Sequence, residues 1–293
     1  MEKYDEQIQN YIRDGQVEIV PPEERDSLGY GEVHYLTHRG VVKPGKNTPL
    51  RVVFNASLGK PSLNDCLHTG KNRVPLMTDI LMRLRLHRII ITGDYCKAFL
   101  HIKIAPQDRN HLRFLWGENL GADDWLLQFL RWCVVVFGVT CSPSELEMVL
   151  TYHMQQFSPR FSRTVAMMLR NTFVDDVIGG GEKWEEVEQF LREANIIAKD
   201  AKMTIQRWTT NDPHLQAKLD AEVAGVPSDP KSDVLKLYDS SLKVLGSVLN
   251  RANGEDVFTF QMISSYNSGH GWMNYNTSRL FVYLATTLAG ECV

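Results

Sequence analysis

The order of apolar and polar positions in the first third of the chain predicts two strands, a helix and a further strand. The stretch 31–56 alternates apolar and polar residues around a loop, which predicts two strands, with Arg51–Phe54 in the second. Apolar residues recur at helical spacing over 76–84. The β-branched run Ile89–Thr92 predicts a buried strand.

The later part of the chain predicts further strands, two helices and a hairpin. A helix opens at Ser142, which we expect to cap it, with Pro143 in its first turn. A second helix, with one apolar stripe, covers 183–201. Apolar residues flank an acidic pair in the segment 171–178, which predicts a hairpin. The remaining strands are predicted over residues 100–104, 113–116, 125–137, 203–208 and 243–249.

Composition and charge indicate a globular protein with one basic region. Of its 293 residues, 43% are apolar and 23% are charged, and the net charge of −3 alone argues weakly against binding of nucleic acid. The segment 38–117 holds 14 basic and four acidic residues, a net charge of +10, which leaves −13 for the rest. Such a region can attract phosphates, although solvated arginine-rich faces would have the same composition.

The cysteines and the absence of long apolar runs bear on the compartment. The five cysteines include no CxxC pair and no paired spacing, which is typical of a reducing compartment. We find no signal peptide and therefore expect an intracellular protein, cytoplasmic or nuclear and not secreted. No apolar run reaches the length of a membrane span, so a membrane is not an expected partner.

Three aspartates stand beside apolar segments. Asp94 follows the predicted strand, and Asp175 and Asp176 occupy the tip of the predicted hairpin. Carboxylates are costly to bury without a partner, and several together raise one another's pKa. Magnesium prefers oxygen ligands, and two such ions about 4 Å apart can clamp a phosphoryl group in transfer. An aspartate pair is also common in ordinary turns, so this pair alone does not indicate a metal site.

An ordered series of short motifs surrounds these aspartates. The motifs are RVVFNAS at 51–57, DYCKAF at 94–99, FGVTCSP at 137–143, FVDD at 173–176 and Leu245–Gly246. The series resembles the reverse transcriptases, and the 81-residue separation of Asp94 and Asp175 suits that family. The sequences of the motifs are most similar to those of the BEL/Pao class of long-terminal-repeat retrotransposons. Each motif alone is weak, and their order carries the resemblance.

The resemblance implies an α+β fold of the right-hand polymerase type. We expect fingers and a palm, with a ferredoxin-like antiparallel palm sheet, packed helices and an incomplete or atypical thumb. The expected parts are an N-terminal extension over 1–30, fingers over 31–88 with part of 105–135, a palm over 89–250, and a C-terminal tail or partial thumb over 251–293.

The resemblance also assigns roles to the acidic and basic residues. Asp94, Asp175 and Asp176 match the aspartates that hold two Mg²⁺ ions, with Mn²⁺ as an alternative. Lys43 and Arg51 match residues of the fingers that grip the triphosphate, and Arg suits phosphate through its two-pronged guanidinium. A solvated position on a surface strand is the alternative for Lys43.

Further matches concern the nucleotide sugar and the primer. Phe99 matches the aromatic under the incoming sugar, where a bulky ring excludes a 2′-OH; simple core packing is its alternative. Phe137 and Gly138 match the segment that lines the nucleotide pocket and template, and glycine permits close approach of the backbone. Leu245 and Gly246 resemble the primer-grip hairpin.

Some positions depart from the family pattern. Phe173 stands where the family has tyrosine, and Glu145 and Glu147 place acids in the helix after Pro143, which should weaken polyanion binding. Arg207 lies near a basic position of the family, yet arginine rarely releases a proton, so the proton donor stays unassigned.

The resemblance implies an RNA-directed DNA polymerase, a nucleotidyltransferase that extends a primer on an RNA or DNA template with deoxynucleoside triphosphates. We find no RNase H, integrase or protease motif, so we expect a piece of a larger polyprotein. Two alternatives stay open: an inactive retroelement remnant that only binds nucleic acid, and an interaction domain with no nucleic-acid role. The sequence does not indicate the oligomeric state.

Overall fold

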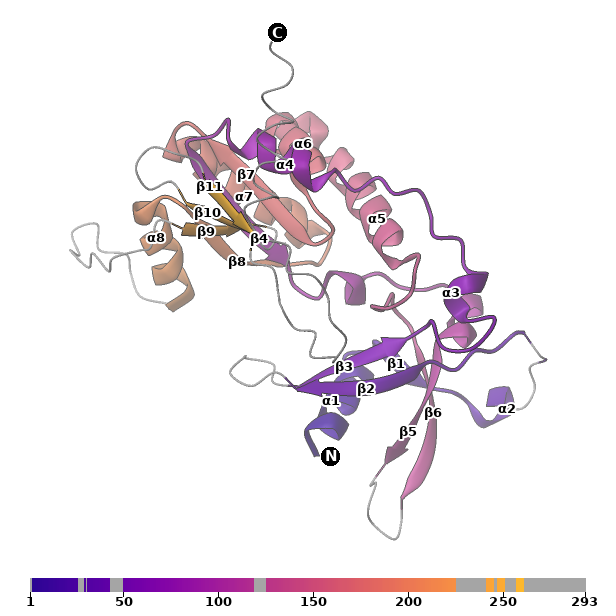
Figure 1. The fold of residues 1–293 in the computed structure, drawn as a ribbon. Coiled ribbons are helices and arrows are strands. Elements are labelled where there is room, and N and C mark those ends of the chain that lie inside the picture. The colour runs from indigo at the N-terminus through magenta and orange to yellow at the C-terminus, as the bar shows by residue number, and fades with distance from the viewer. Residues whose placement is uncertain are drawn as a thin grey trace, which may run out of the picture. The chain divides into compact units, whose positions relative to one another are not determined.

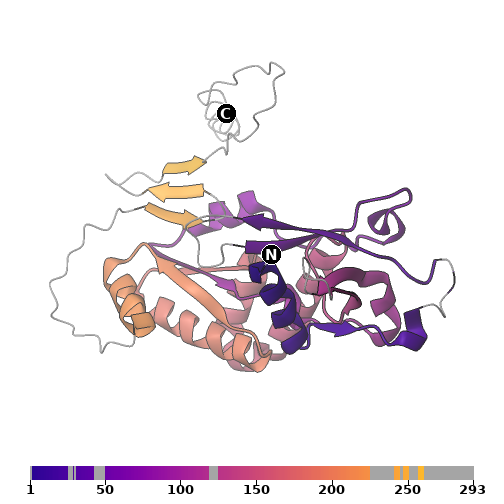
Figure 2. The same ribbon diagram turned by 90° about the horizontal axis from the view of Figure 1, so that it is seen from below.

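The fold is of the α+β class, with helices packed on small antiparallel sheets (Figures 1 and 2). The computed structural model describes residues 2–25, 29, 31–42, 50–118, 125–224, 241–244, 247–250 and 257–260. The chain divides into a unit over Met1–Thr259 and a second unit over Phe260–Val293, and all the described helices and strands begin in the first.

A three-stranded sheet with the order β7-β4-β8 carries the three aspartates. The central strand β4 (Ile89–Tyr95) pairs antiparallel with β7 (Asp176–Gly181) and with β8 (Ile205–Thr210). Ile89, Ile90 and Ile91 are all buried, because β4 is covered on both faces. The run of β-branched residues therefore predicted this strand correctly.

Helices pack against this sheet and complete its core. They are α5 (Ser142–Gln156), α6 (Ser158–Asn171), α7 (Trp184–Asp200) and α8 (Pro213–Ala224). Helix α6 packs against β7, α7 against both β7 and β4, and α8 against β8. The apolar stripe predicted over 183–201 is confirmed, since its buried residues include Val187, Ala194 and Ala198. Trp184, the first residue of α7, is instead exposed.

A second set of sheets forms around a separate core. Strand β6 (Leu126–Trp132) pairs with β5 (Arg113–Glu118) and with β1 (Val17–Ile19), while β2 (Thr37–Val42) pairs with β3 (Leu50–Asn55). These strands confirm the predicted pair in 31–56. Short elements complete this part: α1 (Glu2–Arg13), α2 (Pro22–Arg25), α3 (Leu63–Cys66) and the 3₁₀ turn η2 (Pro106–Leu112). Two other short elements pack with the β7-β4-β8 sheet instead: α4 (Met77–Leu84), against Ile90 and Ile178, and the 3₁₀ turn η1 (Ala98–His101), with Ala98 and Phe99 in its core.

The N-terminal segment is built into this second core. Ile8 of α1 is fully buried, and β1 extends the sheet of β6. The guanidinium of Arg113, which is also fully buried, donates to Asn110 Oδ1 and to the carbonyl oxygen of Glu24 at 2.9 Å each. The segment 1–30, expected as an extension, thus supplies a helix and a strand to this core.

Several sequence predictions differ from the structure. The strand predicted over 125–137 ends at Trp132, the last residue of β6. Over 100–104 the chain forms η1 and then a single bridge between Lys103 and Val134, because a left-handed residue, Lys97 (φ 52°), turns the chain shortly after β4. Ser142 does not cap α5, since its Oγ donates to the carbonyl oxygen of Val136 and the helix is preceded by Cys141.

A further difference concerns the C-terminal strands. The single strand predicted over 243–249 is a pair, β9 (Ser241–Val244) and β10 (Ser247–Asn250), which align antiparallel and are joined by β11 (Val257–Phe260) in one sheet. Period-two alternation cannot distinguish one strand from two consecutive strands. Among the helices that the structure describes, none combines the length and apolar composition of a membrane span.

Candidate metal and nucleotide site

The structure brings the three predicted aspartates together at one end of the β7-β4-β8 sheet. Asp94 of β4 stands directly opposite Asp176 of β7 in the antiparallel register. Directly opposed residues share a face, with Cβ atoms about 4.5–5.5 Å apart. The carbonyl oxygen of Asp175 accepts a hydrogen bond from the Tyr95 amide at 2.8 Å, so Asp175 is fixed beside the same strand end.

A tight turn presents Asp175 and Asp176. Helix α6 ends at Asn171, and Phe173 and Asp176 exchange two backbone hydrogen bonds of 2.8 and 2.9 Å. Val174, one of the two central residues, has φ 58°, which is unusual for a β-branched side chain and costs about 1–3 kcal/mol. The predicted hairpin is therefore a two-residue turn between a helix and one strand, because α6 occupies the place of its first arm.

Burial and mutual repulsion act on the paired acids. Burial raises the pKa of Asp176 to about 6, and the charges of Asp175 and Asp94 add to this effect. The pKa of Asp175 is also raised, mainly by burial and further by Asp94, although a backbone hydrogen bond opposes the shift. A bound cation would relieve this repulsion, as expected of a metal site.

Arg207 provides a positive charge beside the acids. Its Nε donates to Asp94 Oδ1 at 2.8 Å, and its Nη2 donates to Asp94 Oδ2, so both carboxylate oxygens are engaged. Arg207 also lowers the pKa of Asp175 and Asp176. Arg207 lies near a basic position of the family, but no signal in the sequence indicated this ion pair.

The carboxylate oxygens of the three aspartates are suitable ligands for magnesium, but their arrangement in this structure is not that of a metal centre. In the part of the chain that the structure describes, no group of three His, Cys, Asp or Glu side chains is placed to hold a metal ion. Asp94 faces Arg207 instead. Ion binding at these residues therefore requires Asp94 to exchange its partner.

Phe99 and Phe137 form one edge-to-face pair. Their ring centroids are 4.4 Å apart with planes at 63°. Phe99 is 3% exposed and belongs to the main core, whereas Phe137 is 59% exposed. The structure thus places the residue expected under the sugar inside the core, with Phe137 accessible beside it.

Gly138 follows Phe137 in a conformation that favours glycine. Its φ is +96°, and a Cβ atom there would lie 2.6 Å from the carbonyl oxygen of Phe54 in β3. Glycine is therefore needed for the close approach of two backbones, which explains this position independently of any nucleotide.

Asn64 is a further residue of this region, and the sequence assigned it no role. Its Nδ2 donates to the Gly138 carbonyl oxygen at 3.0 Å and to Ser57 Oγ at 2.7 Å, while its Oδ1 accepts from the Thr140 amide at 2.8 Å. These bonds hold the loop after β6 against the loop after β3. A single asparagine in a four-residue helix gives no sequence signal of this role.

The other expected site residues are not brought to the acids by any observed contact. Arg51 is exposed on β3, opposite Val41 of β2. Lys43, Leu245 and Gly246 lie outside the described residues.

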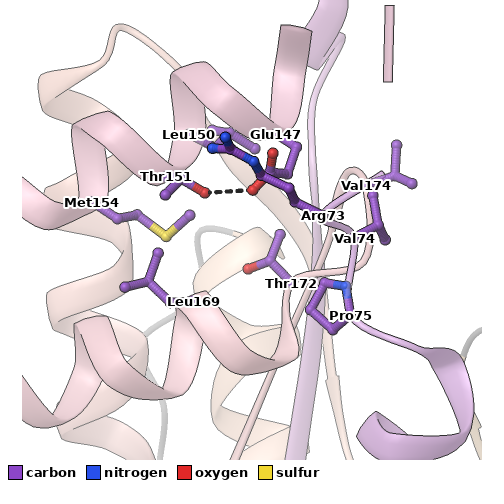
Figure 3. A pocket seen from close by; sticks show the side chains of 10 residues that line it. All are labelled: Arg73, Val74, Pro75, Glu147, Leu150, Thr151, Met154, Leu169, Thr172 and Val174. Atoms are coloured by element: carbon purple, nitrogen blue, oxygen red, sulfur yellow. Dashed lines mark hydrogen bonds between the residues drawn. The ribbon is translucent and has the colours of Figure 1, made fainter. Parts of the chain in front are cut away.

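A small cavity lies beside the aspartate turn (Figure 3). Its volume is about 20 Å³, which is room for about one water molecule and far too small for a nucleotide. Glu147 forms part of its wall and accepts a hydrogen bond from Thr151 Oγ1 at 2.9 Å. The lining residues are Arg73, Val74, Pro75, Glu147, Leu150, Thr151, Met154, Leu169, Thr172 and Val174.

The two acids that depart from the family pattern are both half-buried. Glu147 lies in the cavity wall, and Glu145 interacts with the thiol of Cys141, whose pKa is raised to about 12, mainly by burial. Their charges are thus partly shielded from solvent.

A comparison of the sequence with known protein families finds no family that matches, and a comparison with curated proteins finds no match.

Proposed function

We propose that the chain is the polymerase domain of a reverse transcriptase, of the kind found in BEL/Pao retrotransposon polyproteins. The observation that carries the proposal is the pairing of Asp94 with Asp176 across β4 and β7, with Asp175 beside them. The sequence resemblance requires these acids to meet although they are distant along the chain. A structure with the acids apart would have removed the basis of the proposal.

In this proposal the β7-β4-β8 sheet and its helices form the palm. The two sheets around the second core, β2-β3 and β1-β6-β5, form the fingers together with α1. The β9-β10-β11 sheet would carry the primer grip, since Leu245 and Gly246 come between β9 and β10 in the sequence.

The reaction would be attack of the primer 3′-OH on the α-phosphate of a deoxynucleoside triphosphate, with release of pyrophosphate, directed by an RNA or DNA template. Asp94, Asp175 and Asp176 would hold Mg²⁺, or Mn²⁺, which supplies charge stabilisation for phosphoryl transfer. Arg51 and Lys43 would bind the triphosphate. Phosphate contacts of this kind predict that affinity for primed template falls as salt rises.

Primer extension tests the proposal directly. The purified 293-residue chain should extend a primed RNA template with deoxynucleotides in Mg²⁺, and EDTA or the change Asp175→Asn should abolish extension. Asp108→Asn, which removes the same charge from the exposed first turn of η2, is the matched control and should retain activity. Absence of extension by the unmodified chain in both Mg²⁺ and Mn²⁺ would contradict the proposal.

A second function is favoured by the engagement of Asp94. Because Arg207 occupies both carboxylate oxygens, an inactive remnant that still binds nucleic acid also agrees with the structure. Filter retention of a primed template, without extension in either ion, would identify this case. Salt-dependent retention with extension identifies the polymerase.

The position of Phe99 makes a prediction about sugar selection. Phe99→Val should raise incorporation of ribonucleotides relative to deoxynucleotides, because a smaller side chain beneath Phe137 leaves room for a 2′-OH. The change should also cost about 2 kcal/mol of stability, since Phe99 is buried. Primer extension with each nucleotide type measures the selectivity.

The matched control is Phe114→Val, which shortens an equally buried ring in the other core. It should lose similar stability with no change in sugar selection. Unchanged selectivity in Phe99→Val would assign Phe99 to core packing alone.

A further inference from the structure

The position of Arg207 depends on a β-bulge in β8. In the pairing of β4 with β8, Thr92 stands opposite Thr209 and Asp94 opposite Gln206. Gly93 therefore faces two residues, Arg207 and Trp208. Bulges of this kind redirect a side chain and are frequent beside active sites.

The backbone at the bulge is unusual for an arginine. Arg207 has φ 54°, a left-handed conformation in which glycine is favoured. Trp208 anchors the bulge, because its Nε1 donates to Asn195 Oδ1 at 3.3 Å. A Cβ atom at Gly93 would lie 2.7 Å from the Trp208 ring, so the opposite strand leaves the space that the bulge needs. The strand thus supports a strained residue whose side chain reaches Asp94.

The contact with Asp94 engages both oxygens of that carboxylate. Both oxygens accept from the guanidinium, Oδ1 from Nε at 2.8 Å and Oδ2 from Nη2. The side chain of Asp94 is 20% exposed, whereas that of Arg207 is 78% exposed. The carboxylate of Asp94 is therefore largely buried, while the guanidinium of Arg207 is in solvent. The guanidinium can move away without disturbing the core.

The charge of Arg207 replaces what a metal would provide. Asp94, Asp175 and Asp176 form a repulsive group, and Arg207 is the cation that acts on all three. The pair is two-pronged, but the side chain of Arg207 is 78% exposed, so water and salt compete with it. A divalent cation that uses the oxygens of Asp94 can therefore displace it.

We propose that Arg207 is an internal counter-cation that occupies Asp94 until a divalent metal displaces it. The proposal rests on the proposed function, since it takes the three aspartates as the metal ligands. Arg207 then acts as a positioning residue: it keeps the acids together without metal and sets the metal concentration at which the site fills.

Binding of Mn²⁺ to the full chain without nucleic acid tests this inference. Titration followed by electron paramagnetic resonance of free Mn²⁺ gives the affinity of each variant. Arg207→Gln should bind Mn²⁺ about fivefold more tightly than the unmodified chain, because a modest competitor is removed. Arg207→Lys, which keeps the charge without the two-pronged geometry, should show a smaller gain.

Arg192→Gln is the charge control, because Arg192 is exposed on α7 and the change removes the same charge. Its Mn²⁺ affinity should equal that of the unmodified chain. The added change Asp94→Asn should cancel the gain of Arg207→Gln. An unchanged or weaker affinity in Arg207→Gln, or an equal gain in Arg192→Gln, would overturn the inference.

Primer extension on the same preparations separates this inference from the proposed function. Tighter Mn²⁺ binding in Arg207→Gln without extension by any variant supports the counter-cation and contradicts the polymerase. If the unmodified chain extends primers, and Arg207→Gln binds Mn²⁺ with the same affinity as the unmodified chain, the polymerase is supported and the counter-cation is contradicted.

Discussion

Asp176→Asn is expected to lower the rate of primer extension about a thousandfold or more, and yet to stabilise the metal-free protein at neutral pH. Extension is lost because asparagine cannot supply the anionic oxygen that a metal ion needs at this position. Stability rises because the half-buried carboxylate of Asp176 is repelled by Asp94 and Asp175. Single-nucleotide extension and thermal unfolding in EDTA measure the two effects.

The stability effect depends on pH with a definite sign. The pKa of Asp176 is raised from its ordinary value of 3.8 to about 6, so the folded protein binds more protons than the unfolded chain between these values. The contribution of Asp176 to stability is therefore full below pH 3.8 and is lost as pH rises through 6. Asparagine should restore about 1 kcal/mol at pH 7.5, after allowance for partial exposure.

Magnesium should reverse the order of stability of Asp176→Asn and the unmodified protein. The ion should raise the unfolding temperature of the unmodified protein at pH 7.5, because it binds the folded state, and should have little effect on Asp176→Asn. Asp108→Asn should resemble the unmodified protein in extension, in stability and in its response to Mg²⁺. A less stable Asp176→Asn in EDTA would show that Asp176 has a structural partner rather than repelling neighbours.

Local pattern was sufficient to predict the strand that carries Asp94. The β-branched residues of β4 favour an extended chain, and burial on both faces agrees with their uninterrupted apolar character. The pattern failed over 100–104, where alternation is present but Lys97 turns the chain into η1. A 3₁₀ turn followed by a single bridge has the same alternation of apolar and polar residues as a strand, so periodicity alone could not identify η1.

The meeting of Asp94 with Asp176 could be expected only through the resemblance to reverse transcriptases. The two residues lie on strands that pair across a long intervening segment, and no local signal in one sequence specifies that register. The ion pair with Arg207 was beyond prediction for a second reason. It depends on one extra residue in β8, and an irregularity of one residue changes the alternation too little to be recognised.

For Phe99 the sequence left two interpretations, and at Gly138 the structure adds a second one. A buried ring and a ring at a substrate site have the same apolar signature, and Phe99 is buried. A glycine that admits a substrate and one that admits a neighbouring strand also look alike in sequence. At Gly138 the structure shows a neighbouring strand, because the Phe54 carbonyl oxygen of β3 occupies the space that a side chain would need.

Gly138→Ala is accordingly expected to destabilise the protein by about 3 kcal/mol, whatever its effect on nucleotides. The new methyl group would lie 2.6 Å from the Phe54 carbonyl oxygen, and φ of +96° strains any residue with a Cβ atom. The clash is with backbone in β3 rather than with a flexible side chain, so the loop after β6 must move. Urea unfolding should show a lower midpoint, and the weakened bond to Asn64 should reduce nucleotide affinity.

Gly59→Ala separates the two causes of this loss. Gly59 has φ +97°, nearly the value at Gly138, but the nearest atom to its added Cβ is the Pro61 carbonyl oxygen at 3.7 Å, an ordinary contact. Gly59→Ala should therefore cost only the backbone strain, about 1–2 kcal/mol. The difference between the two variants measures the approach of the loop to β3. Equal losses would mean that this approach is not tight in solution, and Gly138 would then be explained by its φ alone.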